Sequence, residues 1–188
     1  MQKIICLYGR PAAGKTTQAL KLAQEFNLQI FGMGDCLRAE IQSGTDLGRQ
    51  IKKFVDDGTL IPDELMEQVV RSIKADKNKS GIVFDGFPRL LSQAMMLEKL
   101  ITESDFHFIG FFHVRVSEAT ARNRIADRGE KTNRPDDVNP EAVKNRLDAF
   151  AEASIPLIAH YKNKKLQVEI DGENSIDDVY KQIKQSIN

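Results

Sequence analysis

The sequence is poor in residues that cross-link a chain or bind a structural metal. Its 188 residues include two cysteines, three histidines and no tryptophan. Two cysteines supply neither a disulfide framework nor a zinc-binding set, so we expect a reducing, cytoplasmic environment. The histidines lack the spacing of metal ligands, and we interpret them as structural or surface residues.

Charge of one sign and long apolar runs are also missing. Lys+Arg and Asp+Glu each number 27, so no basic field is available for nucleic acid or an anionic membrane surface. The longest apolar stretch, around 108–116, is too short to span a bilayer. No signal-peptide pattern precedes the first apolar run. We therefore expect neither nucleic acid nor a membrane as a partner.

What the sequence does contain is a regular alternation of apolar runs and helical patterns. The runs at 4–8, 28–31, 81–84, 108–114 and 166–170 predict strands, and amphipathic patterns lie between them. This alternation is typical of a parallel α/β sheet, and the length fits one domain. Short helical patterns at 35–43 and 45–56, separated and followed by glycines, indicate an inserted, hinged segment.

Two later segments carry specific expectations. Residues 128–137 have no apolar period, which predicts that the helix after Ser117 ends near Asp127 and that a mobile loop follows. A helix restarts at 139–140 with Val143, Leu147, Phe150 and Ile155 facing inward. Pro156 is expected to kink or break that helix, because proline lacks the backbone N–H that a helix interior needs.

The stretch from Gly9 to Thr17 follows the first predicted strand and precedes a helix. It has the form G-x-x-x-x-G-K-[ST], in which backbone N–H groups and the positive end of the helix face an anion. Lys15 supplies a cation for the β- and γ-phosphates, and the Thr16 hydroxyl can ligate Mg²⁺. The pattern predicts binding of a nucleoside triphosphate.

A loop of this kind leaves a GTPase, an ATPase or a small-molecule kinase open, and the arginines distinguish them. Guanidinium groups bind phosphate oxygens in pairs, so several converging arginines imply more phosphates than one triphosphate carries. Nothing resembles the N-K-x-D motif by which GTPases read their base. The arginines that fall near strand ends, loops or hinges are Arg38, Arg89, Arg124, Arg128, Arg134 and Arg146.

Several motifs together resemble the adenylate kinase family over nearly the whole chain. Residues 9–18 resemble the loop G-x-P-G-x-G-K-G-T-Q, residues 34–38 resemble G-D-x-L-R, and residues 85–89 match D-G-[FY]-P-R. The spacing of Arg128, Arg134, Asp136, Asp137 and Arg146 resembles the short form of the family's lid and the helix after it.

The resemblance implies a P-loop fold with a five-stranded parallel sheet, a nucleoside monophosphate (NMP)-binding insertion near 32–61 and a short lid near 124–138. It implies the reaction ATP + AMP ⇌ 2 ADP with Mg²⁺ and a cis peptide bond at Phe87-Pro88. The phosphate-binding residues spread over two hinged segments and need no partner chain, so we expect a monomer. The acceptor phosphate is already an anion, so we assign no catalytic base and expect catalysis by alignment and charge stabilisation.

The resemblance also implies a role for individual residues. The catalytic set would be Lys15, Arg89, Arg128, Arg134 and Arg146. ATP would be bound by Gly9, Pro11, Ala12, Ala13, Gly14, Lys15, Thr16, Thr17, Arg124 and Arg128. AMP would be bound by Met33, Leu37, Arg38, Ile61, Gly86, Arg89, Gln93, Arg134 and Arg146, and Mg²⁺ would be organised by Thr16 and Asp85, with Asp35 a further candidate.

Three positions depart from the family pattern. Ala12 replaces a loop glycine, which predicts a slightly different loop if positive φ is needed there. Thr16 replaces a glycine and brings the loop closer to the general Walker form. Met33 stands where a threonine usually lies beside the AMP base, so UMP or CMP stays open as the acceptor, although Gln93 favours adenine. A regulatory nucleotide-binding protein on the same scaffold is the alternative outside enzymes.

Overall fold

A computed structural model describes residues 1–132 and 135–187. Its sheet has five parallel strands in the order β2-β3-β1-β4-β5. The strands are β1 (Gln2–Tyr8), β2 (Leu28–Gly32), β3 (Gly81–Asp85), β4 (Phe106–Arg115) and β5 (Gln167–Asp171). Each predicted strand is present, and the predicted five-stranded parallel sheet is confirmed.

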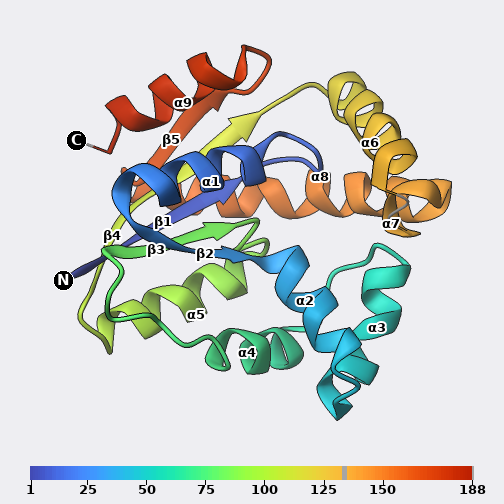
Figure 1. Ribbon diagram of the computed structural model, residues 1–188, viewed down its shortest axis with the longest axis horizontal. Helices are drawn as coiled ribbons and strands as arrows, with labels where there is room; N and C mark the ends of the chain where they lie inside the picture. Colours follow the sequence, from blue (N-terminus) through green and yellow to red (C-terminus); the bar gives the residue numbers. More distant parts are fainter. Residues whose placement is uncertain (133–134, 188) are drawn as a thin grey trace.

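Helices cover both faces of the sheet (Figure 1). The described helices are α1 (Lys15–Phe26), α2 (Met33–Gln42), α3 (Asp46–Asp56), α4 (Asp63–Arg71), α5 (Leu91–Thr102), α6 (Glu118–Thr132), α7 (Pro135–Val138), α8 (Pro140–Asn163) and α9 (Ile176–Gln185). In the described part of the chain, none combines the length and the apolar content that crossing a bilayer requires.

Two buried clusters hold these layers together, and β1 divides them by alternation. Ile4, Cys6 and Tyr8 face the cluster that includes residues of α4, α5 and α8. Ile5 and Leu7 face the cluster that includes residues of α1, α6 and α9. Successive side chains of a strand point to opposite faces, so a central strand buried on both sides reads as one continuous apolar run.

Several helix ends are fixed as their residues predict. The Thr45 side chain accepts a hydrogen bond from the Gly48 N–H, and the Ser175 side chain accepts one from Asp178. Gly58 follows α3 with a φ of 69°, the left-handed conformation in which glycine carries no steric penalty. Pro62 lies at the N-cap of α4.

The prediction of an irregular loop over 128–137 is wrong for the described residues. Helix α6 continues to Thr132, and residues 135–138 form α7. The inward stripe of α6 is Ala121, Ile125 and Gly129, and its last member has no side chain to signal burial. Gly129 instead packs against Asp137, where an added Cβ would lie 3.3 Å from the Asp137 carbonyl oxygen.

The predicted break at Pro156 is also wrong, since α8 runs through it to Asn163. The carbonyl that loses its helical partner belongs to Glu152, which is exposed, as is Pro156 itself, so water can satisfy it. Buried Ala153, Leu157 and Tyr161 anchor the helix on either side. Ile155, which we expected to face inward, is 73% exposed because it lies on the same outer side.

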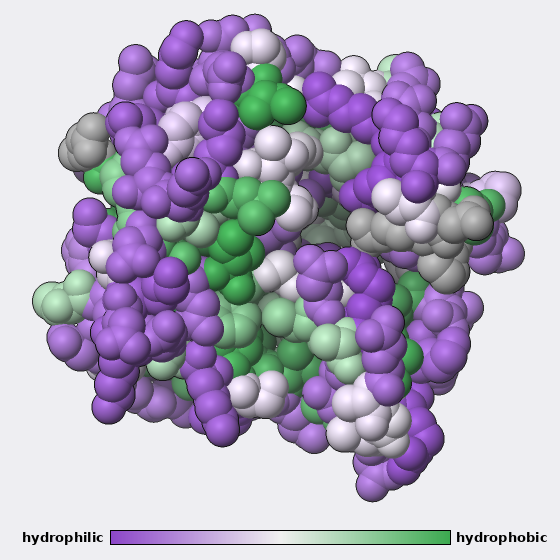
Figure 2. All heavy atoms as spheres, viewed as in Figure 1, coloured by the Kyte–Doolittle hydropathy of each residue, from purple (hydrophilic) through white to green (hydrophobic). Residues whose placement is uncertain are grey.

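The carboxyl ends of the strands point toward two helical segments, α2–α3 and α6–α7 (Figure 1). The three neighbouring strands end level with one another, because Asp85 pairs with both Leu7 of β1 and Gly32 of β2. Figure 2 shows the surface hollowed between the two helical segments, at the edge of the sheet where α/β proteins bind ligands.

Candidate active site

The loop after β1 wraps tightly against the neighbouring strand. Gly9 has a φ of 150°, and a Cβ there would lie 2.3 Å from the Val114 carbonyl oxygen of β4. Gly14 is the N-cap of α1 with a φ of 95°. Ala12 has a φ of 58°, so the loop keeps a left-handed residue at this position although alanine replaces glycine. Replacement of glycine by alanine at position 12 therefore leaves the positive φ unchanged and adds local strain instead.

Lys15 is held at the mouth of this loop. Its Nζ donates to the carbonyl oxygens of Gly9 at 2.9 Å and Arg10 at 2.8 Å. Enclosure of the ammonium lowers the pKa of Lys15 to about 8, Asp85 opposes the shift, and the nearby Arg89, Arg146 and Arg128 add to it. A phosphate anion would relieve this accumulation of positive charge.

The floor of the cleft pairs a hydroxyl with a carboxylate. The Thr16 hydroxyl donates to Asp85 Oδ2, and Asp85 is 8% exposed. Thr16 lies in the first turn of α1, which follows the loop after β1, and Asp85 is the last residue of β3, the strand hydrogen-bonded to β1. Among the described residues, no three His, Cys, Asp or Glu side chains gather into a metal site. Two oxygen donors beside a phosphate loop are nevertheless what Mg²⁺ needs when the phosphates complete its shell.

Four of the predicted arginines line one cavity of about 270 Å³ together with Lys15. Arg89 Nε donates to the Gly86 carbonyl oxygen at 3.0 Å, and its backbone N–H donates to Gln93 Oε1 at 2.8 Å. Arg38 is paired with Asp35 one helical turn earlier on α2. The four arginines are Arg38, Arg89, Arg128 and Arg146.

Two of these arginines meet on a buried carboxylate. Arg128 donates to both oxygens of Asp137, through Nε at 2.6 Å and Nη2 at 2.8 Å. Arg146 Nη1 donates to Asp137 Oδ1 at 2.8 Å and to the Asp136 carbonyl oxygen at 2.9 Å. Burial alone would raise the pKa of Asp137, but these hydrogen bonds hold it below its usual value. Asp137 thus joins α6, α7 and α8.

A second hollow of about 510 Å³ lies on the other side of the phosphate loop. Arg124 lines it and donates to the Gly172 carbonyl oxygen at 3.2 Å. The remaining predicted donor-side residues that line it are Ala12, Ala13, Gly14, Lys15, Thr16, Thr17 and Arg128. Lys15 and Thr16 border both hollows, so a triphosphate held by the loop could extend from one to the other.

Some predicted residues are not at the cavity surface. Met33, Leu37, Ile61 and Gln93 are each at most 5% exposed, and they do not line the cavity of about 270 Å³. Arg134 lies outside the described residues. Sequence reasoning missed Phe150, Tyr8, Thr59 and Leu60, which do line the cleft. Tyr8 and Phe150 looked like core positions of a strand and a helix, and the inward face of each continues to the cleft.

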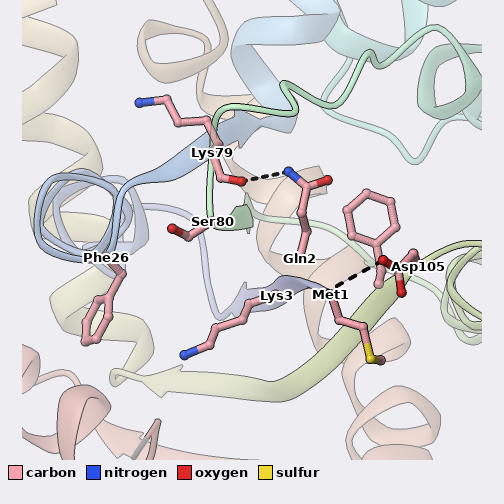
Figure 3. A pocket seen from close by; sticks show the side chains of 8 residues that line it. Met1, Gln2, Lys3, Phe26, Lys79, Ser80 and Asp105 are labelled. Carbon is pink, nitrogen blue, oxygen red and sulfur yellow. Dashed lines mark hydrogen bonds and ion pairs between the residues drawn. The ribbon is translucent and has the colours of Figure 1, made fainter.

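A third hollow, of about 580 Å³, lies at the opposite edge of the sheet around the first residues of β1. Figure 3 shows that Lys3, Lys79 and Phe26 point in different directions there and do not converge. Lys79 Nζ is engaged by Asn27 at 3.0 Å. Despite its size, this open hollow lacks the convergent charge of the cleft beside the phosphate loop.

Comparison with known proteins points to the same kind of site as the phosphate loop and the arginines that line its cleft. The family model described as adenylate kinase matches residues 7–166. The chain belongs to the adenylate kinase family. As a member it is a phosphotransferase enzyme, a nucleoside monophosphate kinase rather than a regulatory binding protein.

Curated adenylate kinases resemble this family member over almost their whole length. The adenylate kinase of Bacteroides thetaiotaomicron is 36% identical over 185 residues, covering 98% of this chain and 97% of the relative. The Thermus thermophilus enzyme is 37% identical over 186 residues, covering 99% and 97%. That of Flavobacterium psychrophilum is 34% identical over 186 residues, covering 98% and 97%.

Proposed function

We propose that this adenylate kinase family member reversibly transfers the γ-phosphoryl group of ATP to AMP, giving two ADP. The observation that carries the proposal is one cleft bounded by a phosphate loop on one side and by arginines of four different elements or loops on the other. If a triphosphate alone were bound at the loop, the arginines that face the loop would have no second anion to bind. A nucleoside monophosphate supplies that anion.

The donor nucleotide is proposed to occupy the loop and the hollow beside Arg124. The backbone N–H groups of the loop other than Pro11, together with the start of α1, would face the β- and γ-phosphates, with Lys15 as the cation beside them. Gly9, Pro11 and Ala12 shape the loop where it meets the central cleft. The adenine would lie in the hollow that Arg124 and Gly172 border.

The acceptor nucleotide is proposed to lie between α2, the segment 58–60 and Gly86. Arg38 and Arg89 would hold its phosphate. Gly86 has a φ of 77°, so its left-handed backbone favours glycine there, whereas space does not require it, because an added Cβ would lie 3.6 Å from Arg89 in ordinary contact. Gln93 is buried, and its side chain accepts a hydrogen bond from the backbone N–H of Arg89, so it supports the backbone at Arg89. It would reach a base only from beneath the surface of the cleft. Leu37, Ile61 and Met33 form the apolar backing of this side.

We propose that Mg²⁺ is held by Thr16 and Asp85, partly through water, together with the phosphates of ATP. The hydroxyl and carboxylate already lie within hydrogen-bond distance of each other at the floor of the cleft. Bound Mg²⁺ supplies positive charge to the β- and γ-phosphate oxygens. Asp85 is nearly buried and fixed at the end of β3, which pre-positions its oxygen atoms.

Catalysis is proposed to rest on alignment and charge, without a general base. The acceptor oxygen of a monophosphate is already an anion, so no proton has to be removed from it. Arg128 and Arg146 would stabilise charge on the phosphoryl group in transit, with Arg134 as a further candidate. Their shared partner Asp137 holds both guanidinium groups in one geometry.

Water is the competing phosphoryl acceptor, and the flanking segments are proposed to exclude it. Residues 32–61 and 124–138 border the cleft. Asn145 Nδ2 of α8, the helix that follows the second segment, donates to the Asp57 carbonyl oxygen of the first at 3.0 Å. Closure of such segments before chemistry would favour transfer to AMP over hydrolysis. The phosphate loop and the four arginines that face it can complete both phosphate sites without a partner chain, so we expect a monomer to be active.

A coupled assay of ADP formation tests the proposal. ATP with Mg²⁺ is supplied together with AMP, dAMP, GMP, CMP or UMP in turn. We expect turnover to be fastest with AMP. Fastest turnover with CMP or UMP would transfer the acceptor assignment to a pyrimidine, and absence of turnover with every acceptor would overturn the proposed reaction.

The variant Arg89→Ala tests the two-phosphate arrangement. Because Arg89 lies on the acceptor side, we expect kcat/KM for AMP to fall by about 10³-fold or more, with ATP binding changed little. Calorimetric titration of ATP and of AMP, in separate experiments, gives the two affinities. Equal turnover by wild type and variant would remove Arg89 from the reacting centre.

A further inference from the structure

Phe150 contacts the phosphate loop on both sides of its first glycine. Its ring stacks on Tyr8, the residue before Gly9, with centroids 5.2 Å apart and planes inclined by 27°. The guanidinium carbon of Arg10, the residue after Gly9, lies 5.3 Å from the centre of the same ring. Stacked rings and a cation above an aromatic face are both attractive arrangements.

Arg10 is itself held in place by a second contact. Its Nη1 donates to the Val116 carbonyl oxygen at 3.0 Å, just beyond β4. The backbone of Arg10 has a separate role, because its carbonyl oxygen is one of the two that accept Lys15 Nζ. Movement of Arg10 would therefore move a partner of the Lys15 ammonium.

Phe150 also belongs to the helix that presents Arg146. The two residues are four positions apart on α8, so they lie on the same side of the helix about one turn from each other. Both line the central cleft. The chain of contacts thus runs from Lys15 through the loop to Phe150 and along one helical turn to Arg146.

We infer that Phe150 is a positioning residue. Through its contacts with Tyr8 and Arg10, it fixes the distance between Lys15 on the donor side and Arg146. Neither Phe150 nor Arg10 has to touch a nucleotide for this role. Phosphoryl transfer depends on that separation, because a misplacement of about 1 Å in a reacting geometry can lower a rate by about 100-fold. Binding of each nucleotide by itself depends on it less.

The inference rests on the proposed function, and its test compares variants under saturating ATP and AMP. For Phe150→Ala we expect kcat to fall by about ten- to a hundred-fold while the KM values change by less than about threefold. Phe150→Tyr keeps the ring and should retain kcat. Arg10→Lys keeps the charge but loses the planar group, and Arg10→Ala loses both. We therefore expect kcat to be lower in Arg10→Lys than in the wild type, and lowest in Arg10→Ala.

Matched controls separate positioning from a loss of stability. Ile158→Ala removes a side chain that is also half-buried in α8 against the same cluster, but eight residues, or about 12 Å, further along the helix. We expect this variant to keep the wild-type kcat below its melting temperature. In the double variant Arg10→Ala/Phe150→Ala, the loss of kcat should be clearly smaller than the product of the two single losses, since both changes break the contact between Arg10 and Phe150.

Three outcomes would overturn the inference: losses that multiply in the double variant, an equal loss in Ile158→Ala, or an effect confined to KM. If Phe150→Ala fails to fold, the Arg10 variants and Phe150→Tyr still decide it. Failure of the proposed reaction looks different, because wild-type protein would then form no ADP with any acceptor.

Discussion

At the scale of the single residue, the ammonium of Lys15 lies where positive charge is already concentrated. Its pKa of about 8 is low for lysine because the loop encloses the group, with arginines close by. The ammonium must be protonated to hold phosphate, so affinity for ATP should decrease as the pH rises above 8. We expect a decrease of about tenfold per pH unit, measured by calorimetric titration between pH 7 and pH 10.

The variant Lys15→Arg is the control for this pH dependence. A guanidinium stays charged over the whole range, so the variant should bind ATP with an affinity that is weaker but nearly constant with pH. If the affinity of the wild type for ATP stayed constant up to pH 10, the prediction would be wrong, because Lys15 would not lose its proton in this range or its charge would not contribute to ATP binding.

Ala12 tests the strain in the phosphate loop. An alanine at a φ of 58° costs about 1 kcal/mol, and glycine removes that cost. We expect Ala12→Gly to raise the free energy of unfolding by up to about 1 kcal/mol, after the greater freedom of glycine in the unfolded chain is counted. Denaturant unfolding measures it. Ala13→Gly, at a buried position without positive φ, should lower stability, and equal losses in both variants would contradict strain at Ala12.

At the scale of the element, Asp137 ties three helices together. Its side chain is fully buried and accepts hydrogen bonds from Arg128 and Arg146. We expect Asp137→Asn to lower the free energy of unfolding by about 1–3 kcal/mol at pH 7. Since the pKa of Asp137 is lower folded than unfolded, its contribution is present above the unfolded pKa and is lost as the pH falls through the folded one. The difference in stability between wild type and variant should therefore shrink as the pH falls through the folded pKa of Asp137.

An exposed pair on α8, the helix that carries Arg146, provides the comparison for Asp137. Asp148 accepts a hydrogen bond from Lys144 at 2.7 Å, with both side chains more than half exposed. Asp148→Asn should change stability by less than about 0.5 kcal/mol, because water screens exposed ion pairs. Equal losses in the two variants would show that Asp137 is not distinguished by its burial.

Helices and strands differ in how well their local sequence predicts them. Strands β1 and β3 are almost wholly apolar and buried, so their sequence pattern identified them. The end of α6 and the continuity of α8 were missed. In both places the decisive contact joins two different elements: Gly129 of α6 packs against Asp137 of α7, and Tyr161 of α8 against Phe111 of β4 with ring centroids 4.3 Å apart.

At the scale of the whole molecule, the two sides of the cleft meet at Gly58. This residue has a φ of 69°, and an added Cβ would lie 2.4 Å from the Ala142 carbonyl oxygen and 2.9 Å from Arg146 Cγ. Gly58→Ala should therefore force the end of α3 away from α8 and weaken AMP binding by about tenfold, or about 1.4 kcal/mol. Titration with AMP measures this, with ATP affinity expected to change little.

Gly44→Ala is a closely matched control for Gly58. Gly44 has nearly the same φ, 68°, but an added Cβ meets nothing within 4 Å. Both variants should lose about 1–2 kcal/mol of stability from the left-handed backbone. If both also lost AMP affinity equally, backbone strain rather than contact with α8 would explain the effect.

The amino-acid sequence by itself determined the parallel sheet, the phosphate loop and the family. Those features depend on local periodicity, on glycine and lysine at fixed spacing, and on short motifs that stay contiguous. The cis bond at Phe87-Pro88, implied by the family resemblance, is also present. Arg38, Arg89, Arg128 and Arg146 were identified one by one as phosphate ligands, and their common cavity agrees with that reading, although their roles stay predictions.

Only the tertiary structure decided how those arginines are held and which side chains lie behind them. Asp137 joins α6, α7 and α8, Met33 and Gln93 are buried and do not line the cleft, and Phe150 joins the phosphate loop to α8. None of these contacts has a local signal, because each depends on which elements the sheet order places side by side. The burial of a carboxylate, or the approach of a ring to a guanidinium, is a property of packing between distant parts of the chain.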